Sequence, residues 1–381
     1  MDDINLLILL KSVDGGTGTY LEGLLDLSKV YKPQNIEINV LVLEKPKFRN
    51  SNIDGYTYFP RKRAMERKYR LRLDVVISLI KEIIWFKQHI NKFHPNIVLS
   101  SDAHSILISE TTKKIFNFKY KTISVIQNNL TRVFEYRLQG NLRPVVKSVF
   151  SYFLRKSNSV VTVSKYLSKD VYKLFGLDRL PATISMLMPN KVLKTDNLKN
   201  RDEDRNIIVS VARLDNQKDH ETLLKAFDIV YEDLKNTELW IVGDGPLLKE
   251  LKILTSKLGI KKSVKFFGWV QDSEKLLQKC DVFVLSSKWE GFPLSILEAM
   301  CVGLPVIASD CKYGPREIIG NNTYGILFPV GDYNKLAESL ISLLRDKKKR
   351  NYYAKKSKER HQKYLNDRML LKYKRIIDSI K

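Results

Sequence analysis

Two glutamates and the expected start of a helix fall within residues 284–310. Glu290 follows an apolar strand at 282–285, and Glu298 lies eight positions later, on a helix with an apolar face. A helix start offers unpaired N–H groups and the positive end of a dipole, which suit a phosphate. Nearby carboxylates accept hydrogen bonds from the hydroxyls of whatever group is attached to that phosphate. Pro293 suits the first position of this helix, since a missing N–H costs nothing there.

Two cations five positions apart follow another apolar strand, at 206–212. Arg213 has a planar guanidinium that holds two phosphate oxygens at once, and Lys218 supplies a point charge. In a loop at a strand end, this pair suits a diphosphate. Read singly, such charges are more often ordinary surface residues, and the same holds for a single glutamate. Gly243, in the turn after the strand at 239–242, lets a ligand approach the backbone closely.

The 27 residues from 284 to 310 resemble the signature of retaining, nucleotide-sugar-dependent glycosyltransferases of family 4. The resemblance is near-continuous from about residue 209 to 332 and looser before it. It implies an α/β fold with two Rossmann-like domains facing a central cleft, the glycosyltransferase B architecture. A chain of 381 residues also suits two domains. We expect a first domain at 1–188, a linker at 189–205, a nucleotide-sugar-binding domain at 206–360, and a C-terminal helix at 361–381 that returns to the first domain.

The resemblance also assigns roles to single residues. Arg213 and Lys218 would hold the donor's diphosphate and, with the amides of residues 292–295, stabilise charge on the departing β-phosphate. Glu290 would bind hydroxyls of the donor sugar, and Glu298 the ribose. The expected catalytic set is therefore Glu290, Arg213 and Lys218, without a covalent nucleophile, a metal or a cofactor. The residues expected to bind the nucleotide sugar are Gly15, Gly16, Thr17, Asn128, Gly243, Val270, Phe292, Pro293, Leu294, Ser295 and Glu298.

The first domain would contribute from its strand ends. A glycine turn at 14–20 follows the first strand and resembles the family's loop that faces the transferred sugar and the acceptor. Many family members carry a histidine at the end of a later strand, where this chain has Gln127 and Asn128 instead. Asn128 would donate to a sugar hydroxyl without acid–base chemistry. His104 is the nearest imidazole, and a single histidine in a loop is more often structural.

The chain has 66 basic and 42 acidic residues, a net charge of +24. This excess favours an anionic partner, either a nucleic acid or an anionic membrane surface. Seven of the twelve residues at 61–72 are basic, ahead of an apolar helix. This run is either a solvated helix face or a surface that meets lipid, with Trp85 or Phe86 at the interface. Residues 345–381, with fifteen basic and four acidic residues, leave the same two interpretations open.

Three cysteines are too few and wrongly spaced for a disulfide framework or a zinc site, and Cys280, Cys301 and Cys311 fit small buried thiols in a reducing cytosol. Acidic residues before the first apolar run disfavour a signal peptide, and no apolar run approaches the length of a spanning helix. We therefore expect a cytoplasmic protein, peripheral on the inner face of the cell membrane.

The expected reaction is transfer of a hexose or N-acetylhexosamine from a nucleotide-diphosphate sugar to a glycan or polyisoprenoid-linked acceptor in surface polysaccharide synthesis, such as O-antigen or capsule. The expected nucleotide is UDP. One alternative is a nucleotide-sugar epimerase or hydrolase on the same fold. The other is a basic nucleic-acid-binding protein, but the chain has no aromatic–basic RNA motif or helix-turn-helix pattern, so we expect no nucleic acid partner.

Overall fold

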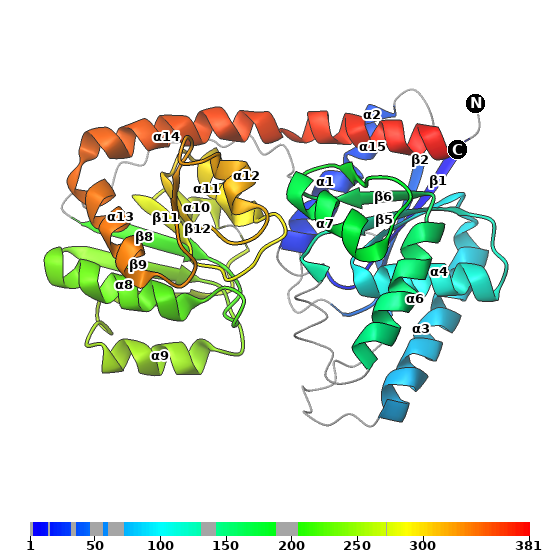
Figure 1. The fold of residues 1–381 in the computed structure, drawn as a ribbon, viewed down its shortest axis with the longest axis horizontal. Helices are drawn as coiled ribbons and strands as arrows, with labels where there is room; N and C mark the ends of the chain where they lie inside the picture. Colours follow the sequence, from blue (N-terminus) through cyan, green and yellow to red (C-terminus); the bar gives the residue numbers. More distant parts are fainter. Residues whose placement is uncertain are drawn as a thin grey trace. The chain divides into compact units, whose positions relative to one another are not determined.

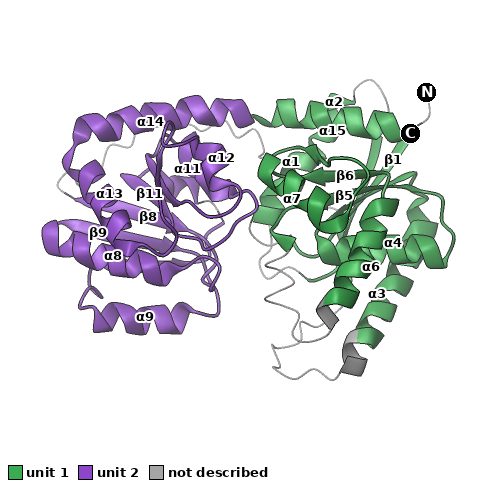
Figure 2. Cartoon of the chain, viewed as in Figure 1, with its two compact units in different colours: residues 1–190, 365–381 green, residues 191–364 purple. Residues whose placement is uncertain are grey.

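The computed structural model describes residues 3–13, 16–31, 36–45, 56–59, 72–130, 142–187, 205–271 and 273–381. The chain forms two compact units (Figure 2): residues 1–190 with 365–381, and residues 191–364. All of the expected linker except residue 205 lies outside the described residues. The C-terminal segment joins the first unit from Leu365 rather than from residue 361. Residues up to Tyr364 stay with the second unit because the Tyr364 ring packs against Phe292.

The described strands of the first unit form one parallel sheet in the order β3-β2-β1-β4-β5-β6-β7 (Figure 1). They are β1 (Ile4–Leu10), β2 (Ile36–Val42), β3 (Tyr56–Tyr58), β4 (Ile97–Ser101), β5 (Lys121–Ile126), β6 (Ser159–Thr162) and β7 (Ala182–Thr183). The helices are α1 (Gly16–Leu25), α2 (Leu27–Val30), α3 (Arg72–Phe93), α4 (Ala103–Ile115), α6 (Leu142–Lys156), α7 (Lys165–Phe175) and α15 (Asn366–Ile380).

The central strands read as continuous apolar runs because helices cover both faces of a parallel sheet. In β1, every residue from Leu6 to Leu10 is fully buried. On one face, Leu7, Leu9 and Val98 pack with Ile83 and Phe86 of α3.

The expectation that Trp85 or Phe86 meets a membrane is wrong for Phe86, which is fully buried in this core. Trp85 is half-buried and packs edge-on against Phe59, with 5.5 Å between ring centroids. Both side chains face inward because α3 turns them towards the sheet. The basic run before α3 lies outside the described residues up to residue 71.

The described strands of the second unit form a parallel sheet in the order β10-β9-β8-β11-β12-β13. They are β8 (Asn206–Val211), β9 (Thr237–Val242), β10 (Val264–Gly268), β11 (Val282–Leu285), β12 (Val306–Ser309) and β13 (Ile326–Phe328). The helices are α8 (His220–Asp233), α9 (Leu248–Lys257), α10 (Glu274–Leu277), α11 (Leu294–Cys301), α12 (Pro315–Ile319), α13 (Tyr333–Arg345) and α14 (Lys347–His361), followed by the 3-10 turn η1 (Gln362–Tyr364).

Each sheet has one point where the strand order reverses, between β1 and β4 in the first unit and between β8 and β11 in the second. Loops leave neighbouring strands in opposite directions there, so a crevice opens at the carboxyl ends. The residues predicted to bind ligand follow β1, β5, β8, β9, β10 and β11. Within the described part of the chain, no helix combines the length and the apolar character needed to cross a membrane.

Candidate functional site

The loops after β8 and β11 meet at the reversal point of the second sheet. The two strands pair in parallel, with Ile208 opposite Val282. Beyond them, the backbone N–H of Lys288 donates to the Gln217 carbonyl oxygen at 2.8 Å, and Gln217 Nε2 donates to the Trp289 carbonyl oxygen at 2.9 Å. These reciprocal contacts hold the two loops together as one surface.

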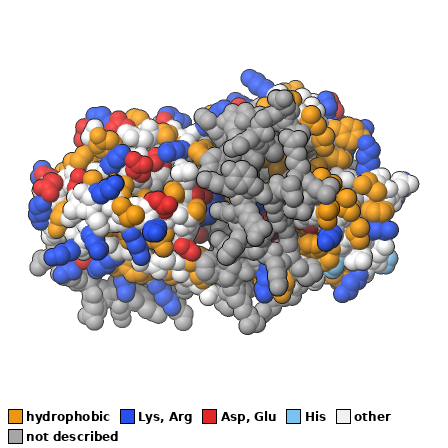
Figure 3. Space-filling view, turned by 90° about the horizontal axis from the view of Figure 1, so that it is seen from below, with side chains coloured by type: hydrophobic (Ala, Val, Ile, Leu, Met, Phe, Trp, Pro, Cys, Tyr) orange, Lys and Arg blue, Asp and Glu red, His pale blue; other side chains and the backbone are white. Residues whose placement is uncertain are grey.

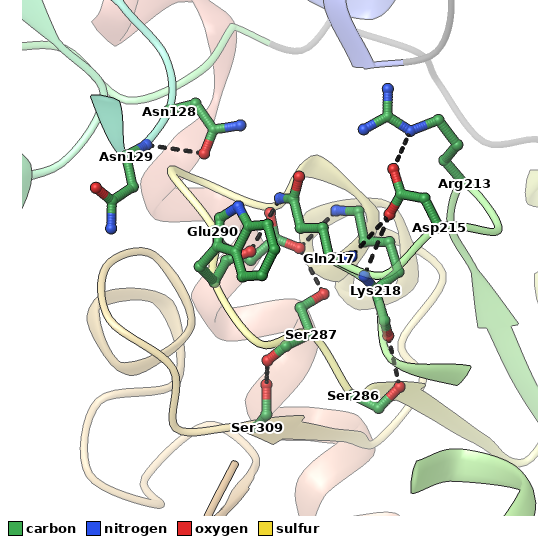
Figure 4. Close-up of polar contacts among 11 residues, drawn as sticks. Asn128, Asn129, Arg213, Asp215, Gln217, Lys218, Ser286, Ser287, Glu290 and Ser309 are labelled. Carbon is green, nitrogen blue, oxygen red and sulfur yellow. Dashed lines mark hydrogen bonds and ion pairs between the residues drawn. The ribbon is translucent and has the colours of Figure 1, made fainter. Parts of the chain in front are cut away.

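An ion pair lies at the centre of this surface (Figure 4). Lys218 Nζ is 2.5 Å from Glu290 Oε1, and the Ser287 hydroxyl donates to the same oxygen at 2.7 Å. Ser309, at the end of β12, donates from its hydroxyl to the Ser287 carbonyl oxygen at 2.5 Å. The Lys218 side chain is 17% exposed and the Glu290 side chain 6%. A pair this buried keeps both charges oriented because the hydrogen bonds satisfy the carboxylate.

Asp215 organises the cations of the β8 loop. Its Oδ2 accepts from Arg213 Nε at 2.6 Å, and its Oδ1 accepts from the backbone N–H groups of Gln217 and Lys218 at 3.1 and 3.3 Å. The Arg213 side chain is 61% exposed, and its two terminal nitrogens bond to none of the described residues. Asp215 therefore fixes one edge of the guanidinium and leaves the other edge for an anion.

The start of α11 differs by one residue from the prediction. Pro293 is the N-cap, with ψ at 105°, and α11 begins at Leu294. Pro293 is therefore not the first helical residue, contrary to the prediction, because its own backbone is extended. The Phe292 ring is buried and lies edge-on against Tyr364, so only the backbone of Phe292 is available to a ligand. Gly314 packs against this segment, since a Cβ there would lie 2.5 Å from Pro293 Cδ.

The predicted residues on α11 share its first turns. Leu294 is buried, and Ser295 and Glu298 are half-buried. The apolar residues Ile296, Leu297 and Met300 form the buried face, as the spacing predicts. The first-turn amides of a helix lack partners within the helix, so the start of α11 contributes N–H donors at the same edge of the sheet as Glu290.

The predictions for Gly243 and Val270, two residues expected to bind the nucleotide sugar, differ in part from the structure. Gly243 has φ of 140°, and a Cβ there would lie only 1.9 Å from the Ala212 carbonyl oxygen. The close packing of Gly243 against Ala212, directly after β8, is therefore enough to require glycine here, whether or not a ligand binds nearby. Val270 lies beyond β10, which ends at Gly268 rather than at residue 270 because the register shifts after Phe266. Val270 is half-buried in the segment that follows.

His220 begins α8 directly behind the loop cations. It is buried, and neither ring nitrogen has a protein partner. Burial, with the Lys218 ammonium as the second cause, lowers the pKa of His220 to about 4, while the Asp215 carboxylate opposes the shift. His220 is therefore neutral at pH 7, and its ring is buried at the start of α8.

The predicted residues of the first unit form a separate group. Gly15 lies outside the described residues, while Gly16 and Thr17 form the first turn of α1. The predicted turn through residue 20 is therefore wrong, because Gly18, Tyr20 and Leu21 already form the buried face of the helix. Asn128, after β5, accepts from the backbone N–H of Asn129 through Oδ1 at 2.8 Å.

His104 is structural, as expected. Its Nε2 lies 2.7 Å from Oε2 of the buried Glu82. Gln127, next to Asn128, donates from Nε2 to the Ser101 hydroxyl. The strand ends of the first unit therefore present Asn128 and the start of α1.

Sequence reasoning missed three residues that shape the site: Asp215, Ser287 and Ser309. Asp215 lies between the two predicted cations in the sequence, so its contacts with this loop could have been predicted from its position. Ser287 lies three positions before Glu290, and the pattern of the chain gives no indication of its bond. The Ser309 contact spans 22 residues and depends on the pairing of β11 with β12.

The overall fold matches that of solved structures over almost the whole chain. HepE from Anabaena in complex with UDP-glucose superposes with a TM-score of 0.78 at 18% identity, over 99% of this chain and 100% of that one. Crystalline TarM superposes with a TM-score of 0.74 at 14% identity, over 99% of both chains. These matches confirm the fold class: an α/β protein of two Rossmann-like domains with the glycosyltransferase B architecture.

Residues 194–360 match the family model described as glycosyl transferases group 1. A Campylobacter jejuni protein is 30% identical over 252 residues, 64% of this chain and 66% of its own length. It is named N-acetylgalactosamine-N,N'-diacetylbacillosaminyl-diphospho-undecaprenol 4-alpha-N-acetylgalactosaminyltransferase.

Two further relatives are similar over shorter shares. An uncharacterized glycosyltransferase of Methanocaldococcus jannaschii is 27% identical over 64% of this chain and 62% of its own length. The Escherichia coli UDP-Gal:alpha-D-GlcNAc-diphosphoundecaprenol alpha-1,3-galactosyltransferase is 34% identical over 37% of both chains. The chain thus spans less than two thirds of the length of each of these three relatives.

Proposed function

We propose that this protein is a retaining glycosyltransferase that transfers a hexose or N-acetylhexosamine from a UDP-sugar to a glycan or lipid-linked glycan. The observation that carries the proposal is the Lys218–Glu290 pair at the reversal point of the second sheet, with Arg213 on the same loop. Cations, an oriented carboxylate and a helix start converge at one sheet edge, which suits a diphosphate joined to a sugar.

The residues act in this proposal by electrostatics and positioning. Arg213, Lys218 and the first-turn amides of α11 stabilise the charge that grows on the β-phosphate as the sugar departs. Glu290 already has one oxygen occupied by Lys218 and Ser287, so its other oxygen accepts from the sugar hydroxyls. Glu298 accepts from the ribose. Gly243 and Val270 border the nucleotide, while Gly16, Thr17 and Asn128 serve the sugar and acceptor from the first unit.

Two features of the chemistry belong to the proposal. The acceptor attacks on the face from which the phosphate leaves, so the anomeric configuration is retained without a covalent enzyme intermediate. The neutralising charge comes from Arg213 and Lys218, so we propose that the reaction requires no metal ion.

The acceptor class is proposed from the relatives. Both the Campylobacter and the E. coli proteins carry diphospho-undecaprenol acceptors in their names, and a Rhizobium meliloti relative is named for lipopolysaccharide core biosynthesis. A lipid-linked acceptor in O-antigen or capsule synthesis is therefore proposed here too. The net charge of +24 supports a peripheral position on the anionic inner face of the cell membrane.

Calorimetric titration with UDP, GDP and ADP tests the nucleotide site. We expect UDP to bind, and Arg213→Ala and Glu298→Ala to weaken binding about ten- to a hundredfold, the effect of losing hydrogen bonds to charged groups. The matched control is Arg205→Ala, another exposed arginine with a carboxylate partner, Glu238 at 3.0 Å. Absence of binding to all three nucleotides would reject the proposal, and RNA binding in its place would favour the nucleic-acid alternative.

Product analysis then separates a transferase from an epimerase or a hydrolase. With a UDP-sugar panel and lipid-linked acceptors, we expect product only when the acceptor is present, and an α-linked product from an α-linked donor by NMR. Turnover of the donor without an acceptor would favour the alternatives. Activity that is unchanged by EDTA supports the metal-independent reaction, and loss of activity that Mg²⁺ or Mn²⁺ restores would overturn that part.

A further inference from the structure

Two helices of the first unit expose rows of apolar side chains to solvent. On α3, Val76, Ile77, Ile80 and Ile84 are exposed, with Ile80 half open to solvent at 50%. At 3.6 residues per turn, these four positions lie within about 100° of the helix circumference. They therefore form one continuous apolar row on the side of α3 that faces away from Phe86 and the sheet.

A second row lies on α6. Val145, Val149 and Tyr152 are exposed and recur every three or four residues, so they form a narrow row along the helix. The opposite side of α6 buries Phe150, Phe153 and Leu154. Both helices pack against α4, whose last residue, Ile115, is also exposed. We call the two rows together with Ile115 the aliphatic face.

The exposed charges that the structure describes around the aliphatic face have one sign. Its exposed charged residues on α3, α4 and α6 are cations, among them Lys81, Lys114, Lys147, Arg155 and Lys156. Among the side chains that the structure describes on these helices, the acids are Glu82 and Glu110, and they are buried in contacts with His104 and Ser157. The side chain of Asp74, in the first turn of α3, lies outside the described ones. In Figure 3, hydrophobic side chains gather beside Lys and Arg on the side of the first unit.

We propose that the aliphatic face is a membrane-contact surface that inserts its side chains among the headgroups of an anionic bilayer. Apolar rows bordered by cations are the pattern of helices that lie in the plane of such an interface, because apolar burial and attraction to anionic lipid add. The membrane contact itself is argued from the exposed residues alone. Its role, access to a lipid-linked acceptor, rests on the proposed function. Exposed aliphatic residues replace Trp85 and Phe86 as the side chains that meet lipid.

The direction of the helices supports this purpose. Helices α3 and α6 precede the parallel strands β4 and β6, so their N-terminal ends lie at the carboxyl edge of the sheet. Asn128 and the start of α1 lie at that same edge. A membrane held against the aliphatic face therefore lies beside the residues proposed to serve the acceptor.

Co-sedimentation of the full-length chain with vesicles tests the proposal. We expect binding to phosphatidylcholine vesicles that contain 30% phosphatidylglycerol, weaker binding to pure phosphatidylcholine, and partial loss in 0.5 M salt. The variants Ile80→Gln/Ile84→Gln and Val145→Gln/Val149→Gln should each reduce the partition coefficient at least about tenfold, since each removes two aliphatic side chains from the interface.

The matched control is Ile253→Gln/Leu180→Gln, which removes two exposed aliphatic residues from other surfaces. Ile253 on α9 is 49% exposed, almost the same as Ile80. We expect it to bind vesicles like the wild type. Equal binding by all variants, or self-association of the wild type in place of vesicle binding, would overturn the membrane assignment.

UDP titration of the same variants separates this inference from the proposed function. We expect every variant to bind UDP like the wild type, because none of the substituted residues belongs to the second unit's site. Vesicle binding without UDP binding would reject the enzyme proposal alone, and UDP binding without vesicle binding would reject the membrane surface alone.

Discussion

Lys218 and Glu290 join the two loops of the second sheet's reversal point through a 2.5 Å contact between Nζ and Oε1. The Lys218 carbonyl oxygen also accepts the Ser286 hydroxyl at 2.9 Å, so side chain and backbone of the lysine both contact the β11 loop. The contact fixes the position of Oε1 of Glu290. Because the two carboxylate oxygens are rigidly linked, it also fixes the direction of Oε2.

Glu290→Gln tests the role of that carboxylate. We expect sugar transfer to fall about a hundredfold or more, because the amide accepts less strongly from sugar hydroxyls and leaves the Lys218 ammonium unpaired. UDP affinity should change less than about threefold, a small part of the binding free energy. Initial rates and calorimetry measure the two effects. Glu221→Gln, which breaks the exposed 2.7 Å pair with Lys225, is the control and should leave both unchanged.

Equal losses of UDP affinity and of transfer in Glu290→Gln would contradict this role. They would indicate that the ion pair only maintains the loops, and a loss of circular dichroism signal would accompany that outcome.

His220 predicts a pH dependence of stability. Its pKa is about 4 in the folded chain, against 6.5 for the ordinary side chain. Between these values the unfolded chain binds a proton that the folded chain does not, so the free energy of unfolding falls as the pH drops from 6.5 to 4. Urea unfolding should show that His220→Leu loses about 2 kcal/mol less than the wild type between pH 7 and 4.5. Parallel curves for the two proteins would contradict the buried neutral imidazole.

Gly243→Ala should disturb the second unit. The added Cβ meets the Ala212 carbonyl oxygen at 1.9 Å, and φ of 140° already excludes most side chains. We expect the melting temperature of this unit to fall and UDP affinity to fall at least about tenfold, because the β8 loop must move. Gly259→Ala is the control: its φ is 73° with open space around it, so only the backbone strain remains, about 1 kcal/mol.

Tyr373→Phe tests the attachment of α15 to the first unit. The hydroxyls of Tyr20 and Tyr373 are buried and lie 2.6 Å apart. Removing one leaves the other without its partner, at an expected cost of about 1–3 kcal/mol in denaturant unfolding. The double variant Tyr20→Phe/Tyr373→Phe should recover part of this loss, since no hydroxyl is then stranded. Tyr352→Phe, at an exposed position, should change the stability little.

The positions of most strands and the order of the loops were predictable. Buried parallel strands have continuous apolar sequences, and the loops that carry ligand-binding residues follow their carboxyl ends. The strand at 282–285 matches the structure residue for residue. The short strands β3 and β7 were not predicted, since two or three residues carry no pattern. Ser309 was missed because its contact depends on which strands are neighbours, and neighbouring strands are not visible in the order of the chain.

Charge was the least decisive part of the sequence. The net charge predicted contact with an anionic membrane. It led to Trp85 and Phe86 as the side chains that meet lipid, because aromatic residues next to a basic run are typical of membrane interfaces. Helical phase decides the matter: Phe86 faces the core, while Ile80 and Ile84 face solvent. Only the packing of α3 against the sheet reveals which side is inward.

The first unit is closed by a helix that is synthesised long after the rest of it. Tyr373 follows Tyr20 by 353 positions, and Asn366 donates to the carbonyl oxygen of Gly23. At typical rates of translation, about 20–70 seconds separate the two halves of this contact. The second unit is synthesised within that interval and is complete at Tyr364, before the helix that contacts α1 has been made. The first unit therefore stays without α15 until the second unit has been synthesised, although most of its own chain is translated first, and chaperones would meet the nascent chain at the uncovered face of α1.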